Sequence, residues 1–150
     1  MSRIAMVALS IALLVPPAYA RDGMVVLPSA YSTSVSMDRL EAIAKSRDLK
    51  VFARIDHAGG ARSIGQVLRP TELMIFGHPK GGTPLLQCAQ AYGLELPLRV
   101  LAWEDEQGKS WLGYKDPASY AVSPSNQECE AAFKRLMGTL DTLVREAARQ

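Results

Sequence analysis

The stretch Glu72-Leu73-Met74-Ile75-Phe76-Gly77 decides the fold, because its four central residues form an uninterrupted apolar run between turn residues. Arg69-Pro70-Thr71 precedes this run. A short apolar segment bounded in this way is typical of a strand that is buried in the middle of a sheet. We therefore predict a central strand over residues 72–77, with the other elements arranged around it.

After this strand the sequence indicates a helix and then a hairpin. Thr83 can accept hydrogen bonds from the free amides of a first helical turn, and Pro84 suits the first helical position, so we expect a helix from there to Gly93. Two strand-like runs, 98–104 and 110–114, are separated by Asp105-Glu106-Gln107-Gly108. A short polar connection that contains Gly predicts a β-hairpin.

Before the central strand, residues 24–27 and 50–57 are rich in strand formers, and a helix capped by Ser36 is expected between them. Near the C-terminus, Ser125 and Glu128 have the spacing of a capping box ahead of a long amphipathic helix. The resulting order is β-α-β-β-α-β-β-α. It predicts a two-layer α+β sandwich in which helices cover one face of a mainly antiparallel sheet.

The N-terminus has the pattern of a secretory signal peptide. Arg3 is followed by the apolar run 4–15 and by Ala18-Tyr19-Ala20, so cleavage is expected after Ala20. An uncleaved membrane anchor is the alternative, but the run is shorter than a membrane span and Pro16-Pro17 would break it. We expect a periplasmic protein with a single domain over residues 21–150 and no stable membrane insertion after cleavage.

The charge of the chain excludes one class of partner. Seventeen Lys and Arg residues face 15 Asp and Glu residues, a net charge of +2, and loss of Arg3 with the signal peptide lowers it to +1. The two signs are interleaved, without a basic run of the kind that binds nucleic acid. We predict no nucleic-acid partner. The sequence leaves the oligomeric state open, with a homodimer as one possibility.

The connection Gly77-His78-Pro79-Lys80-Gly81-Gly82-Thr83 is the strongest candidate for a ligand site. Glycines let backbone amides turn toward a ligand, a helix N-terminus favours negative charge, and Lys80 adds a full positive charge. Lys80 precedes the glycines, so this is not a Walker loop. The residues predict a site for a small anion, and the alternative is a tight turn before a capped helix.

Asp56, His57 and His78 are candidates for a polar cluster with Lys80. If the segments meet at one end of the sheet, they could line the anion site or supply acid–base groups. Neighbouring strand residues point to opposite faces, so Asp56 cannot easily orient His57. A metal site is less favoured, because no element carries two candidate ligands at a typical spacing. Satisfied structural groups are the alternative, and the sequence identifies no cofactor.

Cys88 and Cys129 both fall on predicted buried helix faces. In an oxidising compartment such a pair favours a disulfide, and the absence of a Cys-x-x-Cys motif argues against a redox centre. Two buried thiols are the alternative.

Aromatic residues Trp103, Trp111 and Tyr114 lie on the predicted hairpin. They favour cross-strand packing, with a stacking wall for a ligand as the second interpretation.

Four motifs together resemble a bacterial family, the domain-of-unknown-function family 302. They are, in order, Val51 to Ala58, Leu68-Arg69-Pro70-Thr71, Phe76 to Leu85, and Leu96 to Asp105. The resemblance implies a small α+β sandwich and brings no settled activity with it. His78 stands where the family usually has Asn, and residues 121–124 lack the histidine that often follows the last strand, so no role of that histidine carries over.

Three functions are compatible with these residues. The first is a non-catalytic periplasmic domain that binds a small anion through Asp56, His57, His78, Lys80, Gly81, Gly82 and Thr83. The second is a His/Asp-based or metal-dependent enzyme that uses His57 and His78, which requires the two imidazoles to converge. The third is a protein-interaction module that uses an exposed part of the sheet.

Overall fold

The computed structural model describes residues 19–21 and 23–150, so most of the predicted signal peptide lies outside the described residues. Twelve elements follow one another in this part of the chain. They are β1 (Tyr19–Arg21), β2 (Met24–Pro28), α1 (Thr33–Ser46), β3 (Lys50–Asp56), α2 (His57–Ser63), β4 (Thr71–Gly77), α3 (Pro79–Cys88), the 3-10 helix η1 (Gln90–Leu94), β5 (Leu98–Glu104), β6 (Ser110–Lys115), the 3-10 helix η2 (Pro117–Ser119) and α4 (Gln127–Ala148).

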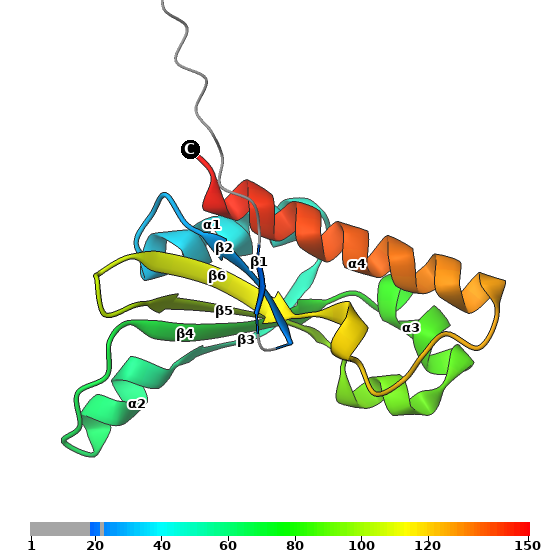
Figure 1. The fold of residues 1–150 in the computed structure, drawn as a ribbon, viewed down its shortest axis with the longest axis horizontal. Helices are drawn as coiled ribbons and strands as arrows, with labels where there is room; N and C mark the ends of the chain where they lie inside the picture. The colour runs from blue at the N-terminus through cyan, green and yellow to red at the C-terminus, as the bar shows by residue number, and fades with distance from the viewer. Residues whose placement is uncertain (1–18, 22) are drawn as a thin grey trace, which may run out of the picture.

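The strands form one antiparallel sheet in the order β1-β2-β6-β5-β4-β3. Figure 1 shows α1 and α4 together on one side of this sheet. The predicted two-layer α+β sandwich is therefore confirmed, with β4 next to the middle of the sheet as its apolar run suggested. The short β1 includes Tyr19 and Ala20, which cleavage after Ala20 would remove, leaving β2 at the edge.

The helix-covered face of the sheet holds the main core. Side chains of β4, β5 and β6 that point toward α1 and α4 are almost completely buried, because each alternate strand residue faces the helices. The largest contributions come from Met74, Phe76, Val100, Leu112, Met37, Leu40, Leu140, Leu143 and Val144.

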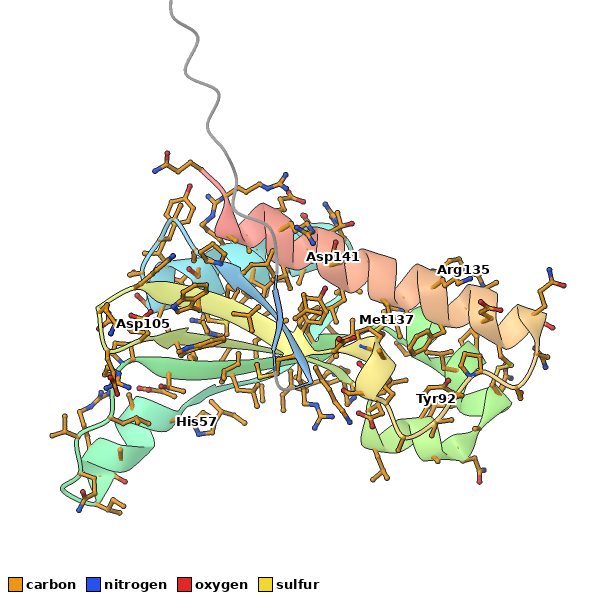
Figure 2. All side chains as sticks on the ribbon, in the orientation of Figure 1. His57, Tyr92, Asp105, Arg135, Met137 and Asp141 are labelled. Carbon is orange, nitrogen blue, oxygen red and sulfur yellow. A yellow bond between two sulfur atoms is a disulfide. The ribbon has the colours of Figure 1, made fainter. Side chains whose placement is uncertain are left out.

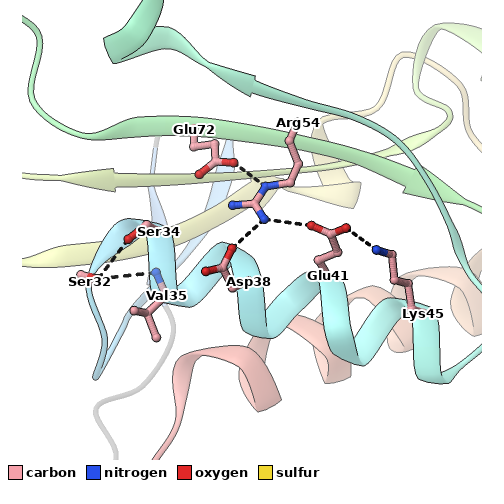
Figure 3. A network of polar contacts seen from close by, with 8 residues as sticks. All are labelled: Ser32, Ser34, Val35, Asp38, Glu41, Lys45, Arg54 and Glu72. Atoms are coloured by element: carbon pink, nitrogen blue, oxygen red, sulfur yellow. Dashed lines mark hydrogen bonds and ion pairs between the residues drawn. The ribbon is translucent and has the colours of Figure 1, made fainter.

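An ion network joins the edge strand β3 to α1 on the same face. The Arg54 guanidinium lies 2.5 Å from Glu72, 2.7 Å from Asp38 and 2.8 Å from Glu41, as Figure 3 shows. Glu41 in turn pairs with Lys45. Because Arg54 bridges β3, β4 and α1, it fixes the strand edge against the helix.

Two helix starts differ from the prediction. Ser32, not Ser36, caps α1, since its Oγ accepts the Val35 N–H, whereas Ser36 is buried and donates its hydroxyl to the Ser32 carbonyl at 2.8 Å. Asn126 caps α4 by accepting the Cys129 N–H at 2.9 Å, while the Ser125 hydroxyl faces the Cys129 sulfur. In both cases a neighbouring residue of the same capping class reaches the free amide better.

The segment after β3 also differs, because a short helix replaces the expected glycine turn. β3 ends at Asp56, where the carboxylate accepts the Gly59 N–H at 2.7 Å and so begins α2 at His57. Asp56 is therefore a helix cap.

Candidate functional site

The sheet register separates the two histidines. Antiparallel pairing places Asp56 opposite Glu72 and Lys50 opposite Gly77, so β3 ends where β4 begins. His57 follows Asp56 at one end of the sheet, and His78 follows Gly77 at the other. Six residues of strand at about 3.3 Å each put roughly 20 Å between these ends. The expected convergence of Asp56 and His57 with His78 and Lys80 is therefore wrong.

The Asp56 end has a structural explanation. The Gly59 N–H and the Arg62 guanidinium, which is 3.1 Å away, stabilise the Asp56 carboxylate and hold its pKa below the usual value. His57 is exposed at the first position of α2, and Figure 2 shows it well away from the α4 residue Arg135. Asp56 caps a helix, and the His57 side chain forms no hydrogen bond or ion pair with the described residues. Neither residue therefore belongs to the candidate site.

At the other end, His78 caps α3. Its Nδ1 accepts the Lys80 N–H at 3.0 Å, which leaves the proton of the neutral ring on Nε2. That Nε2 lies 3.6 Å from the Asp48 carboxylate. Asp48 has a left-handed backbone, with φ 59°, in the turn that ends α1. The imidazole thus links the end of α1 to the beginning of α3.

The glycines next to His78 serve a different purpose from the one predicted. α3 begins at Pro79 instead of Thr83, and Pro84 lies inside it. The Gly81 and Gly82 N–H groups both donate to the His78 carbonyl, at 3.0 and 3.2 Å. Because these amides are already paired within the helix, they do not point at a ligand.

Close packing explains why glycine stands at position 81. A Cβ at Gly81 would lie 3.1 Å from the Leu136 side chain of α4. The absence of a side chain lets α3 approach α4 closely, as glycine does at close helix contacts. The helix also stops earlier than expected, at Cys88, and η1 covers residues up to Leu94.

A pocket of about 380 Å³ lies beside this helix start, between the end of α1, α3 and α4. Its polar lining includes three basic side chains, Arg47, Lys80 and Arg135, against one carboxylate, Asp48. Arg47 pairs with Glu146. Over the described residues, neither Lys80 nor Arg135 forms an ion pair. The pocket therefore has an excess of positive charge, and side chains supply it.

Sequence reasoning found Lys80 and missed Arg47 and Arg135. Both lie on helices remote in sequence, and only α4 packing beside α3 brings Arg135 to the pocket. A weak signal exists for Arg135, since Ala132, Leu136 and Thr139 share its helical neighbourhood and also line the pocket.

Cys88 and Cys129 form a disulfide, which confirms the predicted pair. Their Cα atoms are 6.0 Å apart, and the bond ties the end of α3 to the first turn of α4. A small second core of Leu85, Tyr92 and Ala132 lies beside it. The bond therefore fixes the helix pair that forms one wall of the basic pocket.

The two hairpin tryptophans lie across the strands from each other, whereas Tyr114 is buried on the other face, where its hydroxyl donates to Asp141 of α4. Trp103 lies directly opposite Trp111 in the β5–β6 ladder. The Trp111 indole N–H donates to Asp105 at 2.7 Å, and this bond, with the Lys109 and Gln107 amides, lowers the pKa of the Asp105 carboxyl. Gly108, with φ 75°, supplies the left-handed residue that the turn requires.

The residues described contain no group of three or more His, Cys, Asp or Glu side chains that could hold a metal ion. Nor does any helix in the described part have the length and apolar character needed to cross a membrane.

The sequence matches the family described as "Domain of unknown function DUF302" over residues 25–143. The chain belongs to the DUF302 family. A solved structure, that of the uncharacterised conserved DUF302 protein from Bacillus stearothermophilus, has the same fold, with a TM-score of 0.67 at 13% identity over 85% of this chain and 97% of that one. At this identity the similarity shows the fold alone.

Two curated relatives carry the name "Fluoride-specific ion channel FluC 1", one from Brucella suis biovar 1 (strain 1330) and one from Brucella abortus biovar 1 (strain 9-941). Each is 42% identical to this DUF302 chain over 128 residues, which is 85% of the chain. The matched part is 50% of the first relative and 47% of the second, so the chain spans about half the length of the relatives it matches.

Proposed function

We propose that this DUF302 protein is an exported, non-catalytic domain that binds a small anion in the pocket between α3 and α4. The proposal depends on two basic side chains of the pocket that form no ion pairs in the described part of the chain. Lys80 and Arg135 line one pocket and lack carboxylate partners within the described residues. Two cations that line one pocket and form no ion pair among the described residues favour an anionic ligand.

The site works through side chains in this proposal. The first-turn amides of α3 donate to His78, so the positive charge comes from Lys80 and Arg135, with Arg47 at the border. Arg135 offers a planar set of donors, and Lys80 a compact charge, which together suit a carboxylate, a sulfate or a smaller anion.

The names of the relatives also support anion binding. These relatives are named as fluoride-specific ion channels, and about half of their length matches this chain. A domain that shares a polypeptide with an anion channel is well placed to bind anions near a membrane. We propose an accessory role of this kind for the exported chain.

Calorimetry on the protein purified after expression of the full chain tests anion binding, with fluoride, sulfate and acetate as the probes. We expect at least one probe to bind, and Lys80→Ala with Arg135→Ala to weaken that binding at least tenfold. The matched control is Lys45→Ala with Lys134→Ala, which removes the same charge from exposed pairs outside the pocket. Equal binding in both double variants, or no binding by the wild type, would refute the proposal.

Export has its own test. Mass spectrometry of the protein recovered from a bacterial host should show a chain that begins at Arg21 and lies in the periplasmic fraction. Recovery of an uncleaved chain in the cytoplasm would contradict export.

The enzyme hypothesis based on two cooperating histidines loses its geometric basis. His57 and His78 follow opposite ends of the β3–β4 ladder, beyond the reach of a shared substrate atom.

A further inference from the structure

The sheet face that points away from α1 and α4 is apolar. Strand residues alternate, so the neighbours of the buried core residues on β4, β5 and β6 point to this second face. In the part of the chain that the structure describes, Figure 1 shows no helix lying across it. We call it the open face, and its main residues are Val26, Leu73, Ile75, Leu101, Trp103 and Trp111, all of them only partly buried.

Beside the open face, the chain extends an apolar arm. This α2 arm comprises residues 57–70, and Figure 1 shows α2 displaced from the sheet to the side opposite α1 and α4. After α2 the arm presents Ile64 at 74% exposure, Val67 at 98% and Leu68 at 46%. Val67 therefore buries almost none of its surface within its own copy, which is unusual for an apolar side chain in an ordered connection.

The charged side chains next to the open face lie at its borders and have contacts within one copy. At one end, Lys115 lies 2.7 Å and Arg99 3.8 Å from the buried carboxylate of Glu95. At the hairpin end, Lys109 lies 4.3 Å from the centre of the Trp111 ring. Since these charges lie at the rim, they can stay in contact with solvent when the apolar centre of the face is covered.

We propose that two copies of this chain associate through their open faces, with each α2 arm packed on the sheet of the other copy. The arm and the face occur on the same side of one molecule, so a two-fold arrangement buries both surfaces of both copies in a closed pair. Two sheets pack face to face about 10 Å apart, and the aromatic and branched side chains of the open face suit such packing.

The open face alone has about half the area of a standard interface. Five strands about 4.8 Å apart and roughly 17 Å long give a flat face on the order of 400 Å². A standard interface buries about 800 Å² per partner. The uneven surface of the side chains and the α2 arm must supply the rest of this area. The face alone would be a small interface, so the arm is essential to the pair.

Sedimentation equilibrium of the protein purified after expression of the full chain tests this inference. We expect a dimer at 100 µM wild-type protein. Val67→Asp should weaken dimerisation at least tenfold, because it places a charge in the interface. It should leave the circular dichroism spectrum unchanged, since Val67 makes almost no contact within its own copy.

Val35→Asp is the matched control, because Val35 is also an exposed valine, at 42%, but lies on α1 on the covered side of the sheet. This variant should remain a dimer. Trp103 and Trp111 give a second readout, since their fluorescence should shift to the red on dilution of the wild type and stay red in Val67→Asp.

Three results would overturn the inference. They are a wild-type monomer at 100 µM, a Val67→Asp variant that dimerises as well as Val35→Asp, and a monomer whose tryptophans become buried only when phosphatidylglycerol vesicles are added. The last result would assign the open face to a membrane surface. Anion binding could survive any of these outcomes, because the basic pocket lies elsewhere.

Discussion

The two faces of the sheet carry similar side chains and differ in what covers them. On β4, Met74 and Phe76 are completely buried beneath α1 and α4. The alternate residues of the same strand, Leu73 and Ile75, remain partly exposed. The alternation of a strand places both sets, but only the helices distinguish them. An apolar residue in this protein therefore has a stability role on one face and, in our proposal, an association role on the other.

The covered face also holds the polar contacts that position the helices. Arg54 fixes α1, and the Tyr114 hydroxyl donates to Asp141 of α4 at 2.8 Å. Burial raises the pKa of Tyr114 strongly, so its hydroxyl stays protonated and continues to donate across the neutral range. The difference between the faces thus extends from apolar packing to hydrogen bonding.

The largest effect should come from comparing the same truncation on both faces. Leu112→Ala removes a fully buried side chain on β6, and we expect the free energy of unfolding to fall by about 4 kcal/mol. Leu101→Ala, on the open face of β5, should cost about 1–2 kcal/mol in dilute, monomeric protein. Urea unfolding measures both values, and equal losses would contradict the assignment of the faces.

Loss of the disulfide should have the next largest effect. Cys88 and Cys129 are separated by 41 positions, and replacing both by Ser should lower stability by roughly 3–4 kcal/mol on the chain-entropy model. The bond supports α3 beyond the end of the sheet, beside the small second core. Thermal unfolding of the double variant and of reduced wild type should agree. A double variant as stable as the oxidised wild type would mean that the bond contributes nothing.

A smaller, pH-dependent effect should follow from Arg54→Met. At pH 7 this change should cost about 1–2 kcal/mol, because Glu72 and Glu41 lose a partly buried partner.

The pH dependence has a defined sign. Hydrogen bonds from Lys45 and then Arg54 lower the pKa of Glu41 in the folded protein. Its contribution is therefore present above the unfolded pKa of about 4.3 and is lost as the pH falls through the lower folded value. Urea unfolding between pH 7 and 3 should show wild type and Arg54→Met converging in acid, and a constant difference would exclude this explanation.

The smallest effect should appear on the open face at Gly113. An added Cβ would lie 2.9 Å from the ends of the Met24 and Trp103 side chains, so these ends must shift to accommodate it. Gly113→Ala should cost about 1 kcal/mol or less and shift tryptophan fluorescence. The control Gly138→Ala, in an open position on α4, should stabilise the protein by about 0.5–1 kcal/mol. A loss above about 3 kcal/mol at Gly113 would show that Trp103 is held rigidly.

Local patterns predicted the elements well and their ends less well. The β4 run, the β5–β6 hairpin and the long last helix all follow from periodicity and turn residues. The caps were displaced because Ser32 and Asn126 directly precede the first residues of α1 and α4 and accept their free amides in place of Ser36 and Ser125. The helix α2 was missed because Gly59 and Gly60 suggested a turn, whereas the Asp56 carboxylate stabilises a helical one.

The candidate site was predicted only in part, for a topological reason. Lys80 and His78 were found from their own segment, but the sequence placed Asp56 and His57 beside them. Antiparallel pairing of β3 with β4 separates the two pairs by the length of a strand. Arg135 joins Lys80 instead, from a helix more than fifty positions later in the chain.

By itself, the sequence of this DUF302 protein determined which segments form strands and helices and that helices cover a sheet, and it favoured a bond between the two cysteines without deciding it. These properties depend on local spacing and on the burial of apolar faces. Only the tertiary structure decided which charged residues share a pocket, which glycines serve packing, and which face of the sheet remains uncovered. Those outcomes depend on strand register and helix placement, which join residues that no local pattern connects.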